Sequence, residues 1–224
     1  MLVEIKDLLN PSQLDKIEEI IQKATFQDGK LTAGMAAQKV KNNQEMKPVA
    51  EQMQLLIRLI TAALGHNQRF HHAALPYRMA DPIVARYENG MTYGNHVDDP
   101  IMGQSGPRFR SDVSMTIFLR PPESYEGGEL TIKTTFGEKK VKLKAGSAVV
   151  YPSSSLHRVE PVTSGERVVV LAWIQSYVRD PAKRELLFEL NQAREFLLRN
   201  EGEAEHTAQV DKSYVNLLRM WSDL

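Results

Sequence analysis

The sequence predicts a mainly β protein with flanking helices, built around an all-β barrel or a double-sheet jelly roll. Apolar residues recur at helical spacing over roughly the first 65 positions, and from about residue 68 to 178 short β-rich runs alternate with turns that contain Gly and Pro. After Arg179-Asp180-Pro181 the helical spacing returns. Many short strands between frequent turns are typical of a barrel or a jelly roll.

The N-terminal region predicts one short strand and two helices. Residues 2–6 alternate weakly, as in a strand, and Asn10-Pro11 is typical of a helix start, where Asn caps the helix and Pro takes its first position. The apolar positions of this helix are Leu14, Ile17, Ile20, Ile21 and Ala24. A polar stretch at residues 39–48 precedes a second helix that ends at Gly65, with an apolar stripe at Met53, Leu56, Ile57, Ile60 and Leu64.

The rest of the chain divides into a strand-rich core and a helical tail. The β-rich runs span 81–88, 111–119, 128–134, 139–152, 156–162 and 166–178. The tail carries two helical stripes, Leu186, Leu190, Ala193 and Leu197, then Val210, Tyr214, Leu217, Leu218 and Trp221. We expect one domain at 1–178, with N-terminal helices packed on a core at about 78–178, and a C-terminal helical subdomain at 179–224 that packs on the barrel or on another subunit.

Composition narrows the class of protein. The chain has 224 residues, 28 basic and 28 acidic, so nothing in its charge points to nucleic acid or to an anionic membrane surface. The absence of cysteine excludes disulfides, thiolate zinc sites and cysteine nucleophiles. No signal peptide or membrane span is visible in the sequence, and a cytoplasmic protein is the default expectation.

Three residues predict a metal site. His96 and Asp98 are separated by one residue, so in an extended segment both side chains point to the same face. His157 lies about 60 residues later, a distance that a barrel can close. Two imidazoles and one carboxylate form the facial triad that holds non-haem Fe(II) and leaves other coordination positions open. By itself, His-x-Asp is more typical of a surface turn, and Gly94-Asn95 and Asp99-Pro100 flank it; the metal site is predicted from the full ordered set.

Arg167 follows His157 by ten residues and opens a strongly apolar run. In a strand it would share a face with Val169, Leu171 and Trp173, and a charge on such a buried face needs a partner. A carboxylate is a suitable partner, because guanidinium binds it through two parallel hydrogen bonds. The alternative is a solvated arginine at the end of a hairpin.

Together these residues resemble a known family. The order Tyr87-Glu88-Asn89-Gly90, Tyr93, His96-Val97-Asp98, Gly127-Gly128-Glu129-Leu130, Gly146, Tyr151-Pro152, His157, Arg167 and Trp173 resembles the Fe(II)- and 2-oxoglutarate-dependent dioxygenases of the prolyl-hydroxylase type. The segments HVDDP and YPSSSLHRVEPVTSGER are similar to the bacterial PKHD-type hydroxylases among them. The resemblance covers residues 80–178 most strongly and implies a double-stranded β-helix, a jelly roll like that of the cupins.

The resemblance also implies roles for individual residues. The iron ligands, which are also the catalytic set, fall on His96, Asp98 and His157, and the clamp for 2-oxoglutarate falls on Arg167. Tyr87 is expected to help hold this co-substrate. Trp173 is expected to line the pocket, and Tyr93 either lines it or supports a loop. The implied cofactors are Fe(II), 2-oxoglutarate and L-ascorbate, and the reaction is hydroxylation by O₂ with release of succinate and CO₂.

Several alternatives stay open at this stage. The second hypothesis is a non-catalytic iron and 2-oxoglutarate sensor module, and the third is a cupin-like enzyme that uses another metal. The glycine-rich segment 102–107 is either a mobile substrate loop or an ordinary loop. The sequence identifies no prime substrate; a protein or a small molecule linked to iron uptake is one expectation. A homodimer through the C-terminal helices is one arrangement that it allows.

Overall fold

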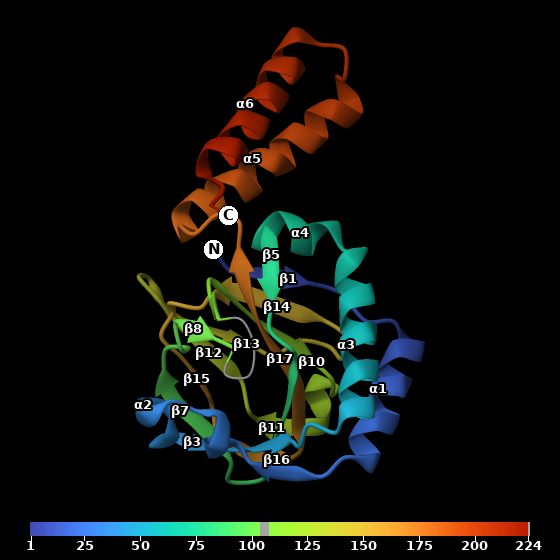
Figure 1. The fold of residues 1–224 in the computed structure, drawn as a ribbon, viewed down its shortest axis with the longest axis vertical. Coiled ribbons are helices and arrows are strands. Elements are labelled where there is room, and N and C mark those ends of the chain that lie inside the picture. The colour runs from blue at the N-terminus through green and yellow to red at the C-terminus, as the bar shows by residue number, and fades with distance from the viewer. Residues whose placement is uncertain (104–107, 224) are drawn as a thin grey trace.

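The computed structural model describes residues 1–103 and 108–223, which form two large antiparallel β-sheets and two small ribbons (Figure 1). The strands of the larger sheet are β1 (Val3–Ile5), β2 (Phe26–Asp28), β4 (Gln44–Met46), β5 (Pro76–Met79), β6 (Ile83–Tyr87), β10 (Val113–Phe118), β14 (Ala148–Pro152) and β17 (Arg167–Ser176). Their order is β1-β14-β10-β17-β6-β4-β2, and β5 also pairs with β17. Neighbours in the sheet are mostly distant in sequence, as in a jelly roll.

The smaller sheet faces the larger one. It contains β3 (Lys41–Asn42), β7 (Thr92–His96), β12 (Leu130–Thr134), β13 (Gly137–Val141) and β15 (His157–Val159), in the order β13-β12-β15-β7-β3. Apolar side chains from both sheets form one buried cluster between them, for example Val149 and Val169 from the larger sheet with Ile132 and Val159 from the smaller. The predicted double-stranded β-helix with flanking helices is therefore confirmed.

Short elements complete the core. Two small ribbons pair β8 (Ile101–Met102) with β9 (Phe109–Arg110) and β11 (Tyr125–Gly127) with β16 (Val162–Gly165). A 3₁₀ turn, η2 (Pro122–Ser124), precedes β11. Gly127 has a φ of +68°, and an added Cβ would lie 2.0 Å from the carbonyl oxygen of Pro161, so the turn requires glycine there.

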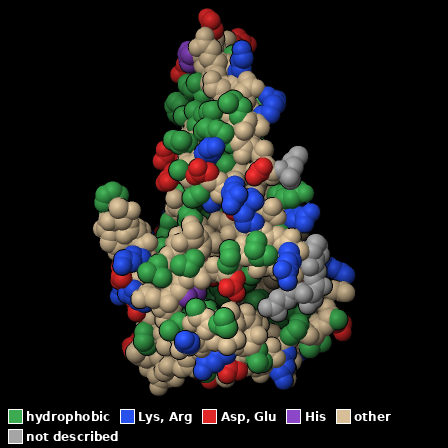
Figure 2. All heavy atoms as spheres, turned by 60° about the vertical axis from the view of Figure 1, so that its left-hand side comes forward, with side chains coloured by type: hydrophobic (Ala, Val, Ile, Leu, Met, Phe, Trp, Pro, Cys, Tyr) green, Lys and Arg blue, Asp and Glu red, His purple; other side chains and the backbone are tan. Residues whose placement is uncertain are grey.

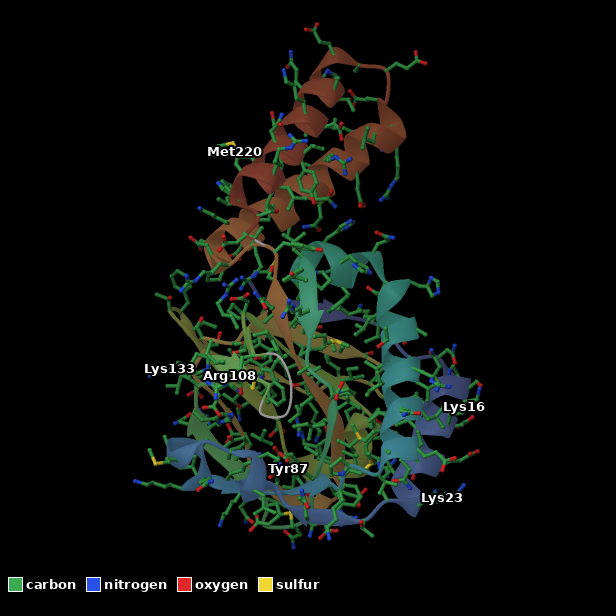
Figure 3. All side chains as sticks on the ribbon, in the orientation of Figure 1. Lys16, Lys23, Tyr87, Arg108, Lys133 and Met220 are labelled. Atoms are coloured by element: carbon green, nitrogen blue, oxygen red, sulfur yellow. The ribbon has the colours of Figure 1, made fainter. Side chains whose placement is uncertain are left out.

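Helices cover the outer face of the larger sheet (Figure 1). They are α1 (Pro11–Lys23), α3 (Ala50–Gly65) and α4 (Gln68–Ala74). The predicted start of α1 is confirmed: the Asn10 side chain accepts from the Gln13 N–H, and the Gln13 side chain accepts from the Asn10 N–H. The helices bury Ile17, Ile20, Leu56 and Ile60 against the sheet. Lys16 and Lys23 project from the outer side of α1, whereas Tyr87 lies among the strands (Figure 3).

Strand β17 separates two environments. Val168, Val170, Ala172 and Ile174 belong to the cluster beneath the helices. On the opposite face, Val169 packs between the sheets, and Arg167, Leu171 and Trp173 line a cavity. The predicted alternation along this strand is thus confirmed.

One prediction about local structure was wrong: residues 68–74 form α4 rather than the start of the strand-rich region. The polar stretch 39–48, for which no structure was predicted, contributes β3 to the smaller sheet and β4 to the larger. The turn η1 (Gly29–Thr32) and the short helix α2 (Met35–Gln38) precede it. The secondary structure of both segments, 39–48 and 68–74, is set by contacts with distant parts of the chain, so it cannot be predicted from their local composition.

The C-terminal helices α5 (Pro181–Asn200) and α6 (Glu205–Trp221) form a hairpin that projects from one end of the core (Figure 1). A small cluster joins it to the core: Leu75, Val178, Leu187 and Tyr214. Hydrophobic side chains gather on this arm in Figure 2, and the exposed ones are Leu186, Phe196, Leu198, Val215 and Met220. Among the described residues, no helix is both long and apolar enough to cross a membrane.

Candidate metal centre and its pocket

His96, Asp98 and His157 come together at one end of the space between the sheets. His96 ends β7 and His157 begins β15, and the two residues are direct partners in the antiparallel pairing of these strands. Asp98 follows two residues after His96. One ligand atom from each of the three residues lies within 4.8 Å of the other two. All three side chains are at least nine-tenths buried, so the group is a preformed, water-poor cluster of metal-binding atoms.

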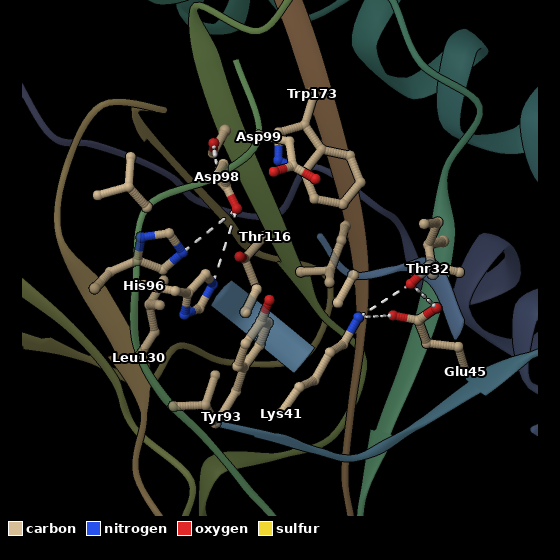
Figure 4. Close-up of a pocket in the computed structure, with 18 of the residues that line it drawn as sticks. Thr32, Lys41, Glu45, Tyr93, His96, Asp98, Asp99, Thr116, Leu130 and Trp173 are labelled. Atoms are coloured by element: carbon tan, nitrogen blue, oxygen red, sulfur yellow. Dashed lines mark hydrogen bonds and ion pairs between the residues drawn. The ribbon is translucent and has the colours of Figure 1, made fainter. Parts of the chain in front are cut away.

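The two imidazoles present the same nitrogen to this cluster. His96 Nδ1 lies 2.8 Å from the Gly94 carbonyl oxygen, and His157 Nδ1 lies 2.9 Å from that of Ser155. A carbonyl only accepts, so each Nδ1 carries the proton and each Nε2 keeps its lone pair. The Nε2 atoms lie 3.9 and 3.8 Å from Asp98 Oδ1 (Figure 4). Burial and the neighbouring His157 lower the pKa of His96 to about 4, which keeps it neutral at pH 7.

A chain of hydrogen bonds fixes Asp98 from behind. Ser114 Oγ donates to Asp98 Oδ2 at 2.5 Å, so Oδ1 is left to face the imidazoles. Ser114 Oγ also lies 2.8 Å from Ser153 Oγ. The Ser153 N–H donates to the Asp112 carbonyl, and the Arg184 guanidinium of α5 donates to the same oxygen. The root of the helical hairpin is thus linked to the carboxylate of the cluster.

Arg167 lies in the same space with an unsatisfied charge. It opens β17 opposite Tyr87 of β6, and only 1% of its surface is exposed. Its guanidinium carbon lies 4.9 Å from the centre of the Tyr87 ring and 5.8 Å from that of Phe118. Its Nε and Nη1 have no hydrogen-bond partner within residues 1–103 and 108–223. A buried guanidinium with two free donors fits an incoming carboxylate.

These residues line one cavity of about 110 Å³. Tyr93 stacks on His96, with ring centres 3.5 Å apart, and thereby fixes that imidazole from one side. Trp173 lines the cavity, and its Nε1 is buried without a partner among the described residues. Tyr87 also lines it, and burial raises the pKa of its phenol to about 12, so the phenol is protonated and can donate. Of the predicted loop at 102–107, positions 104–107 lie outside the described residues.

Sequence reasoning missed one wall of the cavity. Lys41 and Glu45 are buried and paired, with Lys41 Nζ 2.6 Å from Glu45 Oε1. The Thr32 hydroxyl donates to Glu45 Oε2 at 2.6 Å and accepts from Lys41 at 3.1 Å (Figure 4). All three line the cavity. Nothing in the polar composition of 39–48 points to a site, and only strand pairing with β6 and β7 turns Lys41 and Glu45 inward.

The fold and the cavity define a class of protein. Residues 82–175 match the family model of the 2OG-Fe(II) oxygenase superfamily, and residues 181–223 match that of the PKHD-type hydroxylase C-terminal domain. Among solved structures, a viral collagen prolyl hydroxylase from Paramecium Bursaria Chlorella virus-1 has a TM-score of 0.55 at 20% identity, covering 78% of this chain and 96% of its own. A Pseudomonas putida prolyl-4-hydroxylase has a TM-score of 0.53 at 20% identity, covering 78% and 92%. At this identity the likeness shows the shared fold.

Full-length relatives narrow the class to one family. A PKHD-type hydroxylase of Thioalkalivibrio sulfidiphilus is 49% identical over all of both chains, and one of Synechococcus elongatus is 45% identical, again over all of both. The chain belongs to the PKHD-type hydroxylase family and is a 2-oxoglutarate-dependent dioxygenase. The predicted family, enzyme class and cofactors Fe(II) and 2-oxoglutarate are confirmed, and ascorbate is typical of this family.

Proposed function

We propose that this protein hydroxylates a C–H bond of its substrate at a centre held by His96, Asp98 and His157, with Arg167 as the clamp for 2-oxoglutarate. The observation that carries the proposal is the buried Arg167 guanidinium, whose Nε and Nη1 lack a partner among the described residues, in the cavity that also holds the three metal-binding side chains. A dicarboxylate is long enough to bind the metal with one carboxylate and to accept hydrogen bonds from Arg167 with the other. When bound, Fe(II) and 2-oxoglutarate supply the oxidation by O₂, with release of succinate and CO₂.

Each residue has a separate task in this proposal. The two Nε2 atoms and Asp98 Oδ1 would hold Fe(II) beside the cavity, where the metal would supply the activation of O₂. Arg167 orients the far carboxylate of 2-oxoglutarate, and the Tyr87 phenol supports it with a donated hydrogen bond. Tyr93 and Trp173 limit water near the centre, because water would compete with the substrate for the reacting position.

The same proposal includes the domain organisation, the cellular location and the oligomeric state of the protein. Residues 1–178 form the oxygenase domain and residues 179–224 a helical subdomain that anchors on Asp112 through Arg184. The protein acts in the cytoplasm as a homodimer through its C-terminal helices, whose exposed apolar side chains support such a contact. The prime substrate is a protein or a small molecule, and a role in iron uptake rests on the family resemblance alone.

An anaerobic titration tests the proposed centre. Fe(II) and 2-oxoglutarate together should produce a visible charge-transfer band in the wild-type protein, and His157→Ala should abolish it. Iron binding without any band would remove the proposed chelate. Admission of O₂ then separates an enzyme from the sensor alternative, because a sensor would hold both ligands and release no succinate when substrate is supplied from a cell extract.

A further inference from the structure

The cavity has a second polar wall, apart from the metal-binding cluster and Arg167. It consists of Thr32, Lys41 and Glu45, which we call the polar wall. All three residues precede position 82, where the match to the general oxygenase family begins. The chemistry shared by that superfamily therefore does not depend on the polar wall, and a segment added beside a common centre is suited to selecting the substrate.

Burial makes the polar wall a poor stabilising device. Lys41 and Glu45 are 6% and 2% exposed, and removing two charges from water costs more than their attraction usually returns. Their side chains converge on each other across the cavity from the metal cluster (Figure 4). A desolvated pair of charges that lines a ligand cavity is better suited to binding a ligand than to holding the fold.

The unused hydrogen-bonding capacity of the polar wall defines what it can bind. An ammonium group has three donors, and Lys41 spends them on Glu45 and Thr32 with one left over. Each Glu45 oxygen accepts one hydrogen bond and has a further lone pair. The pair is neutral as a whole, so a ligand with a net charge here would add an uncompensated charge to a dry site. The wall thus offers one donor beside free acceptors to an uncharged group.

We propose that the polar wall binds amide groups of the substrate, with Lys41 donating to a carbonyl oxygen and Glu45 accepting from an N–H. Amides are uncharged, and the N–H and C=O of one residue in an extended peptide, like those of a primary carboxamide, point to the same side, which matches this wall. The inference rests on the proposed function, because only the assignment of the metal cluster and Arg167 to iron and 2-oxoglutarate leaves this end to the substrate. An amide can come from a polypeptide or from a small carboxamide.

The test compares an amide with its ester isostere. N-acetylglycine N-methylamide and methyl acetoxyacetate have the same shape, but the ester has no N–H. Binding is measured by saturation-transfer NMR on protein loaded with 2-oxoglutarate and Zn(II), which does not react with O₂. We expect the wild type to bind the amide at least about tenfold more tightly than the ester. The ester has no N–H, so the buried Glu45 carboxylate would remain without a hydrogen-bond donor from the ligand. Equal binding of the two probes would overturn the proposal without any variant.

A double variant tests whether Lys41 and Glu45 cause the preference for the amide over the ester. Lys41→Met with Glu45→Leu replaces the pair by apolar side chains of similar length, a change that buried ion pairs commonly tolerate. The amide preference should fall below about threefold. The matched control is Arg199→Met with Glu195→Leu, which removes another i,i+4 ion pair, on α5, and should keep the full preference. A double variant that retains the preference would refute the role of the polar wall.

One further measurement tests the proposed function separately from the amide proposal, and another identifies the source of the amide. The anaerobic charge-transfer band should persist in the Lys41/Glu45 variant. Absence of this band from the wild type would contradict the proposed function itself, and not only the binding of an amide.

Exposed apolar residues surround the segments that line the cavity, namely Leu31, Met35, Val97 and Ile101. If the amide belongs to a polypeptide, N-acetyl-pentaglycine N-methylamide should bind more tightly than the single-residue probe; if it belongs to a small carboxamide, the longer probe should gain nothing.

Discussion

Replacement of Arg167 by methionine should weaken 2-oxoglutarate binding and leave the metal-free protein at least as stable. Methionine keeps most of the side-chain length and the contacts with the Tyr87 and Phe118 rings, but it removes the charge. In the free protein the guanidinium is 1% exposed, and two of its nitrogens lack partners in the described parts of the chain. Its removal therefore relieves an uncompensated buried charge.

The size of the binding loss follows from the same burial. Truncation of one partner in a buried, hydrogen-bonded charge pair costs about 2–5 kcal/mol. At 1.4 kcal/mol for each factor of ten, the affinity for 2-oxoglutarate should fall by roughly 30- to 4,000-fold. Arg167→Lys keeps the charge but loses the planar pair of donors, so its loss should lie between those of the wild type and Arg167→Met.

Calorimetric titration of the Mn(II)-loaded protein with 2-oxoglutarate measures this loss, and thermal unfolding of the metal-free protein measures the stability. Metal affinity serves as the internal control and should change less than about threefold, because Arg167 is not one of the three side chains that could hold the metal. An affinity for 2-oxoglutarate within threefold of wild type would refute the clamp. A large fall in the stability of the metal-free protein would refute the view that the guanidinium is uncompensated there.

Three further predictions concern the support of the site and the fold. Ser114→Ala removes the hydroxyl that holds the metal-side carboxylate, and anaerobic competition with a chelator should show Fe(II) affinity reduced by about 10- to 100-fold; unchanged affinity would contradict this role. Gly127→Ala meets a backbone carbonyl oxygen and should lower stability by at least about 2 kcal/mol in urea unfolding, whereas Gly65→Ala, with open space around it, should cost nothing. A hydrogen bond from Arg120 lowers the pKa of Glu18 below its ordinary 4.5, so this pair stabilises the fold above pH 4.5 and loses its effect as the pH falls further. The difference in urea midpoint between wild type and Glu18→Gln should therefore shrink below pH 4.5; a constant difference would argue against the pair.

His157 joins His96 and Asp98 only through strand pairing, and the ordered motifs of the family point to it. Most of the fold and the shared face of His96 and Asp98 are predicted from the sequence because those features have local signals. His96 and Asp98 share a face through the two-residue period of extended chain, and the apolar run after Arg167 marks a strand with a buried face. The capping pattern at Asn10 and Pro11 defines the start of α1. Each of these features is decided by residues within a few positions of one another, so a single sequence is enough to find them.

The polar wall shows what such local signals omit. Lys41 and Glu45 lie in a stretch whose composition is that of a solvated connection, and their inward direction is set by pairing with Tyr93 of β7 and Ala85 of β6, 40 or more positions away. No periodicity within residues 39–48 carries that information. The support of Asp98 by Ser114 is hidden in the same way, since the two residues are 16 positions apart and lie in different segments. A metal centre that keeps its chemistry can be encoded in a few short motifs, whereas the surfaces that choose the substrate are assembled from segments joined only by the tertiary fold. In this family member, sequence motifs therefore identify the reaction, and the walls of the cavity are where its substrate should be sought.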